Sequence, residues 1–269
     1  MRILLVDNRQ PVSMADGASV YVPELAPTLA QEHRVVIVTV QPGAVHLAPA
    51  ANAIRRAIES ERAELVHLNN LAGLSLGAVL WAAGDRTPVV MSLHDYRLLD
   101  RPRALNRWLT GRVGLVISPS HYALEEHLRR GFFRQAIRQI LPYGIEPGPL
   151  PRPTEDPFVF RSHWPEPFPV RIQEAFQSGA VVIANRVGGI PEMIRDSVNG
   201  LLVEPGDEAG IEAAIDRLRR SPELAARLRA SAAETARLYD MRFHTAHLTE
   251  AYRQLVSATR ARNLDRRAA

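Results

Sequence analysis

Short runs of apolar and β-branched residues alternate with stretches of helical spacing along the first half of the chain. The apolar runs predict strands at 3–7, 35–40, 65–68, 89–93, 115–118 and 139–142. Helical spacing predicts helices at 18–31, 51–62, 71–83, 104–111 and 122–130. Strands that are apolar along their length and alternate with helices are typical of a parallel sheet covered on both faces. The first half is therefore expected to be an open α/β domain.

Proline is dense over residues 147–157, where it stiffens an extended connection and excludes helix. This stretch predicts a linker between two domains. Beyond it, strands are expected at 158–161, 181–185 and 201–204, and helices at 170–177, 191–195, 208–219, 222–238 and 245–259. The predicted divisions are a first domain (1–146), the linker (147–157), a reduced second domain (158–244), and a C-terminal helix with a basic tail (245–269). The helix is expected to pack back on the first domain, and residues 260–269 are expected to be frayed and solvated.

Two serines mark expected helix starts. Ser120 precedes the helix at 122–130, which carries Glu125 and Glu126 near its positive end. Ser221 stands directly before Pro222, and proline is well tolerated in a first helical turn.

The composition limits the chemistry. All 33 basic residues are arginine, so a phosphate-gripping lysine is excluded and any cationic phosphate contact must come from arginine. Cysteine is absent, which excludes disulfides, a thiolate nucleophile and cysteine–zinc sites. The net charge is only +4 and the basic residues are scattered along the chain, so a nucleic-acid partner is not expected. No signal peptide or membrane-spanning run is evident, and a cytoplasmic location is expected.

The most informative segment covers residues 162–204. Glu166 and Glu174 are separated by seven residues, and after an apolar strand the chain continues Gly188-Gly189-Ile190. A carboxylate can accept two hydrogen bonds from neighbouring hydroxyls. A glycine pair lets backbone N–H groups approach an anion, and the helix that follows would point its positive end there. A plain turn before a helix would need the same glycines, and both glutamates would also be favoured simply by lying near a helix start.

Several segments, taken in order, resemble the retaining glycosyltransferases of the GT-B fold, especially family 4, also called glycosyl transferases group 1. The resemblance is carried by the segments at 1–39, 65–70 and 89–96, the last ending in His94-Asp95-Tyr96, by Tyr143-Gly144-Ile145, and most closely by 162–204. It implies an α/β protein with two Rossmann-type halves, each built on a parallel sheet, with the second half reduced. The implied reaction is transfer of a hexosyl group from a nucleoside-diphosphate sugar to a hydroxyl acceptor, with retention.

The resemblance also implies roles for particular residues. His94 and Glu166 are expected to face the hexose as catalytic residues, and Glu174 is expected to hold the ribose. Gly17, Gly188, Gly189 and Ile190 complete the expected donor-binding set. Asp-x-Asp is absent, so neither a metal nor a cofactor is expected beyond the donor substrate. The arginine-rich tail also suggests peripheral contact with the inner membrane face.

The family's second domain begins with a diphosphate-clamping segment that has no counterpart here. Arginines near the site would have to compensate, and those considered are Arg97, Arg101, Arg103, Arg161, Arg171 and Arg186. A non-catalytic relative that binds sugar or nucleotide, or supports a partner subunit, is therefore the alternative. A hydrolase is a further alternative, because residues 73–77 fit the G-x-S-x-G pattern around Ser75.

Overall fold

The computed structural model describes residues 1–269 except 8–16, 40–46, 70–73, 100–102, 147–155 and 269. Within these residues the first half forms a six-stranded parallel sheet in the order β2-β1-β3-β4-β5-β6. The strands are β1 (Arg2–Asp7), β2 (Arg34–Thr39), β3 (Leu65–Leu68), β4 (Val89–Ser92), β5 (Leu115–Ser118) and β6 (Ile137–Ile140). Each predicted strand of this half is present, and β6 begins two residues earlier than expected.

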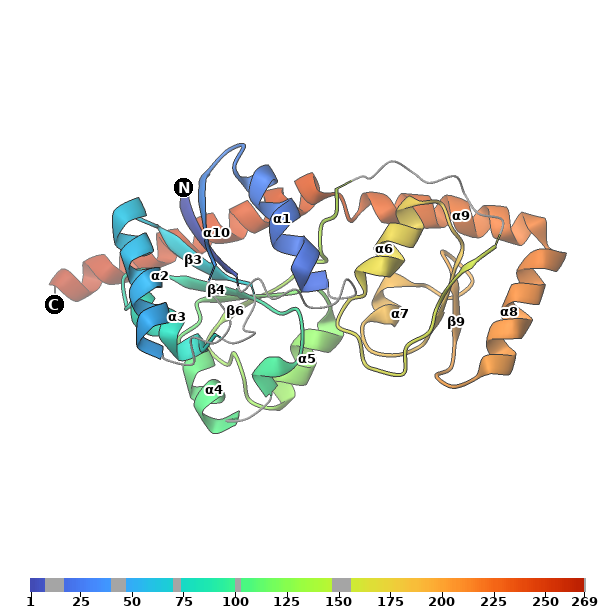
Figure 1. Ribbon diagram of the computed structural model, residues 1–269, viewed down its shortest axis with the longest axis horizontal. Helices are drawn as coiled ribbons and strands as arrows, with labels where there is room; N and C mark the ends of the chain where they lie inside the picture. The colour runs from blue at the N-terminus through green and yellow to red at the C-terminus, as the bar shows by residue number, and fades with distance from the viewer. Residues whose placement is uncertain (8–16, 40–46, 70–73, 100–102, 147–155, 269) are drawn as a thin grey trace.

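Helices cover both faces of this sheet (Figure 1). They are α1 (Gly17–Leu29), α2 (Leu47–Glu61), α3 (Leu76–Ala83), α4 (Arg103–Thr110) and α5 (His121–Arg129), with a short 3-10 turn η1 (Arg97–Leu99). Successive strand residues point to opposite faces. Ile3 and Leu5 accordingly share a core with α1, whereas Leu4 and Val6 share a different core with α2 and α3.

Ser75 lies directly before α3 rather than at the end of a strand. Its side chain accepts a hydrogen bond from the Gly77 N–H at 3.1 Å and so caps the helix. A nucleophile elbow requires the serine in a sharp turn between a strand and a helix. Here β3 ends at Leu68, so the G-x-S-x-G pattern is explained by helix capping.

The second half contains, among the described residues, a three-stranded parallel sheet in the order β7-β8-β9. Its elements are β7 (Phe158–Phe160), α6 (Val170–Gln177), β8 (Val182–Asn185), α7 (Ile190–Met193), β9 (Leu201–Val203), α8 (Glu208–Arg220) and α9 (Pro222–Arg237). Ser221 caps α9 by accepting from the Leu224 N–H, as predicted.

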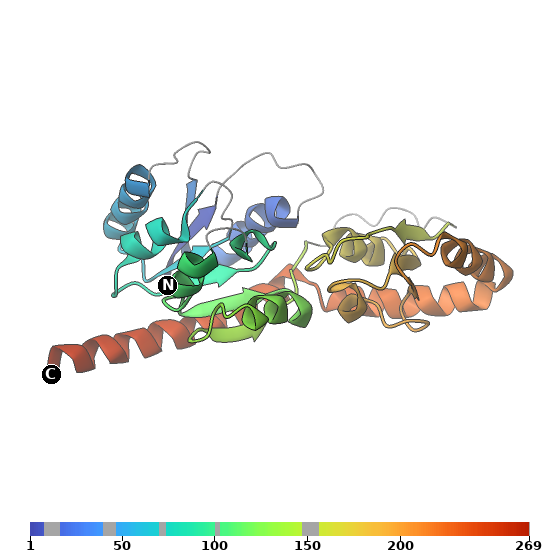
Figure 2. The same ribbon diagram turned by 90° about the horizontal axis from the view of Figure 1, so that it is seen from below.

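The last helix, α10 (Met241–Ala268), leaves the second half and runs back across the first (Figure 2). Tyr252 on α10 hydrogen-bonds to His67 on β3 at 2.6 Å, and Leu255 packs so closely on Gly114 that a Cβ there would lie 2.8 Å from it. The prediction of a frayed tail is wrong, because α10 continues to Ala268. Arg260 forms an ion pair with Glu64, which holds the beginning of this extension on the first domain.

Trp81, Trp108 and Trp164 are exposed, yet none of the helices in the described part of the chain is both long enough and apolar enough to cross a membrane.

Candidate functional site

The two halves share one apolar core. Phe168, just before α6, packs edge-on against Tyr143 from the first half and against Tyr239 beside α10. The same core contains Ile117 of β5 and Phe176 of α6. Gln173 of α6 adds a buried hydrogen bond to the Tyr143 carbonyl at 2.7 Å. The second half therefore rests on the first through apolar burial, although its own sheet is narrow.

Hydrogen bonds also join the two halves at the N-terminus of α5. Ser120 accepts from the Ala123 N–H as the helix cap and donates to the Pro167 carbonyl at 2.7 Å. The Glu192 carboxylate, from α7, accepts the N–H groups of His121 and Tyr122, each at 2.7 Å. A carboxylate at a helix N-terminus is stabilised by unpaired N–H groups and by the helix dipole. The positive end of α5 is thus bound by an anion from the other half.

Replacing Glu192 with Gln is expected to lower the free energy of unfolding by about 1 kcal/mol, because the amide loses the negative charge and offers only one acceptor oxygen. Urea unfolding followed by circular dichroism measures this change. Glu212→Gln, at an exposed position on α8, serves as the control. Equal stability losses in the two variants would show that the contact does not hold the halves together.

Buried polar atoms gather at the carboxyl edge of the first sheet. Three of them lack a hydrogen-bond partner among the residues that the structure describes: Asn69 Oδ1, His94 Nε2 and Tyr96 OH. Asn69 follows β3, and the other two follow β4. Buried polar atoms are nearly always paired, so such a group marks a place where a partner is missing. The carboxyl edge of a parallel sheet is also where ligands bind in open α/β folds.

The tautomer of His94 follows from its neighbours. The Tyr143 hydroxyl donates its proton to the Leu93 carbonyl at 2.8 Å, because a carbonyl can only accept. The His94 Nδ1 atom, 2.9 Å from the same hydroxyl, must then be the donor. The proton therefore sits on Nδ1, and Nε2 carries a free lone pair.

Aromatic packing holds the ring in place. Tyr143 stacks on His94 with 5.1 Å between ring centroids, and Tyr21 of α1 packs at 5.0 Å. Burial, helped by the neighbouring His244, lowers the pKa of His94 to about 3. The imidazole is therefore neutral at physiological pH, and its Nε2 can accept a hydrogen bond but cannot donate a proton.

Glu166 lies in the loop before α6 and is half-buried. The pKa of Tyr96 is raised by burial and then by the negative charges of Tyr122, Glu126 and Glu166. Tyr96 is two residues beyond His94. The field of Glu166 therefore reaches the segment that carries the unpaired imidazole nitrogen.

Glu174 lies on the exposed side of α6. Burial raises the pKa of Glu24 on α1; the N–H of Glu146 opposes this rise, and the carboxylates of Glu146 and Glu174 add to it. Glu146 also accepts from the Thr28 hydroxyl at 3.1 Å. Three carboxylates thus lie near one another where α1 meets the second half.

The glycine pair is required by close packing of two protein loops. Gly188 has a φ of +61°, and a Cβ on it would lie 2.5 Å from the Glu166 carbonyl oxygen. A Cβ on Gly189 would lie 2.1 Å from the Pro167 oxygen. The Gly189 N–H donates to the Glu166 carbonyl at 2.8 Å, and the Ile190 N–H to the Val187 carbonyl at 3.2 Å. These two N–H groups are thus engaged within the protein, and the pair sets the position of Glu166.

Gly17 is the first residue of α1, and the preceding loop lies outside the described residues.

The arginines considered for the diphosphate have other neighbours. Arg161 pairs with Glu208, Arg186 with Glu204 and Arg97 with Asp95. Arg171 lies over the Phe158 ring, Arg101 falls outside the described residues, and Arg103 begins α4.

Sequence reasoning missed the residues that support His94. Tyr21 hydrogen-bonds His244 Nε2 at 2.7 Å, and His244 Nδ1 donates to the Pro142 carbonyl at 2.7 Å. His67 bonds to Ser92 at 2.8 Å as well as to Tyr252. In the sequence only His94 was marked, by the family-like segment 89–96. Its supporting residues could not be found from local patterns, because they lie up to 223 positions apart in the chain.

Two family models match the chain, one in each half. The model of Glycosyltransferase Family 4 matches residues 15–147, and the model of Glycosyl transferases group 1 matches residues 154–235. D-inositol 3-phosphate glycosyltransferase of Saccharomonospora viridis is 36% identical over 100 residues, which are 37% of this chain and 23% of that protein. The lipopolysaccharide core biosynthesis glycosyltransferase LpsD of Rhizobium meliloti is 37% identical over 100 residues, which are 37% of this chain and 28% of that protein. The matched part thus spans only about a quarter of these curated relatives.

Among solved structures, HepE of Anabaena in complex with UDP is similar over 94% of this chain and 100% of that chain, with a TM-score of 0.77 and 17% identity. HepE has also been solved with UDP-glucose, and with UDP and glucose. At this identity the likeness shows the fold. The predicted fold class, α/β with two parallel sheets of the GT-B type, is confirmed.

Proposed function

The chain belongs to the glycosyltransferases of the GT-B fold, and on that premise we propose that it transfers a hexosyl group from a nucleoside-diphosphate sugar to a hydroxyl acceptor. The transfer proceeds with retention of anomeric configuration and without a metal ion or other cofactor. The donor binds between the halves, against the carboxyl edge of the first sheet. UDP is the proposed nucleotide, since HepE structures contain UDP and UDP-glucose.

The observation that carries this proposal is the His94 Nε2 atom, which has no hydrogen-bond partner in the described part of the chain. Leaving a buried acceptor unsatisfied costs about 1–3 kcal/mol, and a bound hydroxyl would remove that cost. A hexose presents hydroxyl donors, and a neutral imidazole with its proton on Nδ1 is matched to accept from one. Tyr96 OH and Asn69 Oδ1 offer further hydrogen-bonding atoms along the same edge.

The second half supplies carboxylates. Glu166 faces the hexose, where its charge stabilises an oxocarbenium-like centre as the bond to the leaving group weakens. Glu174 accepts from the ribose hydroxyls. Gly17, Gly188, Gly189 and Ile190 lie along the diphosphate, although the Gly189 and Ile190 N–H groups already donate to carbonyl groups of the protein.

In the proposed step, the bond between the anomeric carbon and the donor phosphate oxygen breaks while the acceptor oxygen bonds to the same face of that carbon. The acceptor proton passes to the departing phosphate oxygen. No protein nucleophile is required, and neutral His94 positions the sugar rather than exchanging a proton. Charge on the leaving diphosphate is met by backbone N–H groups and arginine.

Hydrolysis of UDP-glucose tests the reaction without a known acceptor. Proton NMR is expected to show UDP release with α-glucose appearing before mutarotation, at a rate unchanged by EDTA. A panel of hydroxyl acceptors analysed by mass spectrometry then identifies a transfer product. Formation of β-glucose first would contradict retention, and loss of activity in EDTA would contradict metal independence.

A second candidate function is binding of a sugar nucleotide without transfer. It is favoured by the surface ion pairs that occupy Arg97, Arg161 and Arg186, three of the arginines considered for the diphosphate. Isothermal titration that detects UDP-glucose binding, combined with no UDP release in the NMR assay, would establish this alternative. Release of UDP at a rate that depends on His94 would exclude it.

Replacing Tyr143 with Phe is expected to raise KM for the donor about 10-fold, because the hydroxyl that fixes the His94 tautomer is removed. The ring stack is kept by Phe. Nitrogen-15 spectra of the imidazole provide a direct readout: wild type should show protonated Nδ1 and unprotonated Nε2, and the variant a mixture. An unchanged tautomer in the variant would show that Tyr143 does not set it.

A further inference from the structure

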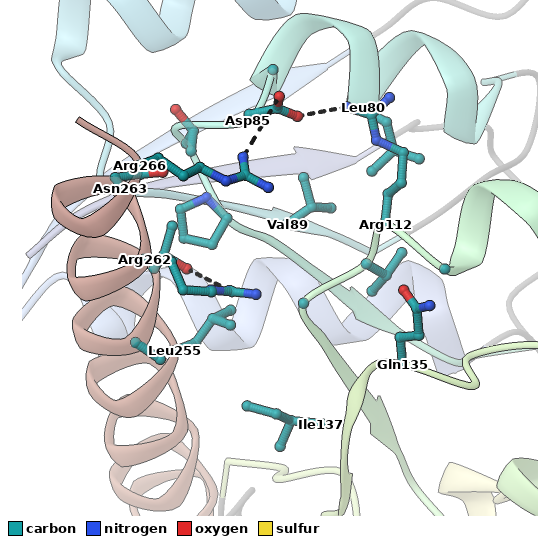
Figure 3. A pocket seen from close by; sticks show the side chains of 18 residues that line it. Leu80, Asp85, Val89, Arg112, Gln135, Ile137, Leu255, Arg262, Asn263 and Arg266 are labelled. Atoms are coloured by element: carbon teal, nitrogen blue, oxygen red, sulfur yellow. Dashed lines mark hydrogen bonds and ion pairs between the residues drawn. The ribbon is translucent and has the colours of Figure 1, made fainter. Parts of the chain in front are cut away.

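A hollow lies at the opposite end of β4 from His94. It is bounded by the amino-terminal ends of β4, β5 and β6 and by the C-terminal part of α10 (Figure 3). Its volume is about 590 Å³, which is within the range of small-ligand pockets. With Val89 at one end of β4 and His94 just beyond the other, the two places are roughly 15 Å apart. The hollow is therefore separate from the proposed donor site.

Positive charge predominates in this hollow. Among the residues that the structure describes, three arginines line it, Arg112, Arg262 and Arg266, together with a single carboxylate, Asp85. Asp85 pairs with Arg112 through one oxygen at 2.9 Å and approaches Arg266 through the other at 4.0 Å. Arg262 donates to the Thr259 hydroxyl of its own helix at 3.3 Å. The carboxylate thus holds two of the guanidinium groups in place while leaving an excess of positive charge.

The rest of the lining is mixed. Leu255, Val89 and Ile137 contribute apolar surface, whereas Gln135 and Asn263 contribute neutral hydrogen-bonding groups. Figure 3 shows the arginines of α10 on one side of the hollow and Gln135 on the other. This wall suits a ligand with an anionic end and a less polar body.

We propose that this hollow binds a phosphate ester. Arginine forks onto phosphate oxygens with two parallel hydrogen bonds and keeps its charge at any physiological pH. A phosphate monoester carries close to two negative charges at neutral pH and would balance the excess of Arg112, Arg262 and Arg266 over Asp85. Arginines near a helix C-terminus are also favoured by the helix dipole, but the dipole does not account for Arg112 or for the cavity.

Inorganic pyrophosphate is the first probe, with backbone amide NMR as the readout. The lining glycines Gly84, Gly111 and Gly114 report on this hollow, whereas Gly188 and Gly189 report on the donor site. We expect saturable shifts of the lining glycines that weaken as salt is raised. The absence of saturable shifts at these glycines would overturn the proposal, whatever happens at the other two.

Arg262→Gln is expected to weaken this binding at least 10-fold. Its side chain is exposed and its hydrogen bond lies within α10, so the fold should persist, which circular dichroism checks. Arg220→Gln, on the exposed face of α8, is the matched control and should bind as wild type does. Equal affinity in both variants would assign the binding to general surface charge and overturn the proposal.

Two sources could supply the phosphate ester, a soluble metabolite or a lipid headgroup. Sedimentation with phosphatidylcholine vesicles, with and without phosphatidic acid, distinguishes them. Sedimentation that requires phosphatidic acid and is lost in Arg262→Gln indicates a lipid headgroup. Pyrophosphate-induced glycine shifts without sedimentation indicate a soluble ester. If neither probe responds to Arg262→Gln, the hollow does not bind phosphate esters.

Discussion

Glu166→Gln is expected to lower kcat at least 100-fold while leaving the fold unchanged. The variant keeps the shape of the side chain but removes the negative charge that would face the developing positive charge on the sugar. Removing one such electrostatic contact typically costs 10²–10³ in kcat. The main chain of Glu166, which accepts the Gly189 N–H and donates to the Trp164 carbonyl, is untouched.

Initial rates of UDP release from UDP-glucose measure the effect. Glu166→Asp keeps the negative charge, but its side chain is one methylene shorter and holds the carboxylate farther from the sugar. Its activity should therefore lie between those of wild type and Glu166→Gln. Glu125→Gln removes a surface carboxylate that pairs with Arg129 on α5 and is the control for general charge loss. A kcat for Glu166→Gln within threefold of wild type would remove Glu166 from the site.

Acidification is expected to unfold the protein between about pH 6 and pH 4. Burial lowers the pKa of four histidines from the ordinary value of 6.5: to about 3 for His67 and His94, and to about 4 for His127 and His244. Above pH 6.5 these groups are neutral in both states, and their contribution to stability is complete. Below it, the unfolded chain takes up protons that the folded chain does not, so stability falls as the pH falls.

The slope can be estimated from the number of protons. Each unmatched proton costs about 1.4 kcal/mol per pH unit, so four histidines together give about 5 kcal/mol per unit near pH 5. The raised pKa of Glu24 opposes this loss by at most one proton. Urea unfolding at pH 7.5, 6 and 5 measures the slope.

His127→Leu provides a matched test of the same explanation. His127 Nδ1 bonds only to the Ala123 carbonyl of its own helix among the described residues, and its Nε2 is unpaired, so an apolar side chain fits the site. In this variant, the slope of the free energy of unfolding against pH should be about one quarter smaller than in the wild type. If the free energy of unfolding of the wild-type protein stays constant from pH 7.5 to pH 5, the histidines are not buried in solution.

Local patterns predicted the secondary structure well where burial is strong. β3, β4 and β5 are fully buried, and their continuous apolar runs marked them within one residue. β6 is half exposed at the sheet edge, so its polar residues Arg138 and Gln139 weakened the signal and shifted the predicted start. The end of α10 was missed because its arginines look like a solvated tail in sequence.

Long-range contacts could not be predicted in the same way. The role of Glu192 depends on α5, some 70 positions earlier, and nothing in either local sequence marks the pair. The glycines Gly188 and Gly189 were visible as a motif, but the loop that forces them to be glycine was not. Position in the fold, rather than residue type, separates His94, whose Nε2 has no partner among the described residues, from His67 and His244, whose ring nitrogens are both paired.

A crystal structure of the protein with UDP-glucose would show directly where the donor sugar binds. We expect the hexose between the halves, with one sugar hydroxyl donating to His94 Nε2 at about 2.8 Å and another within hydrogen-bond reach of the Glu166 carboxylate. The ribose should contact Glu174. A nucleotide sugar bound away from the carboxyl edge of the first sheet, or a hexose that leaves His94 Nε2 unpaired, would contradict it.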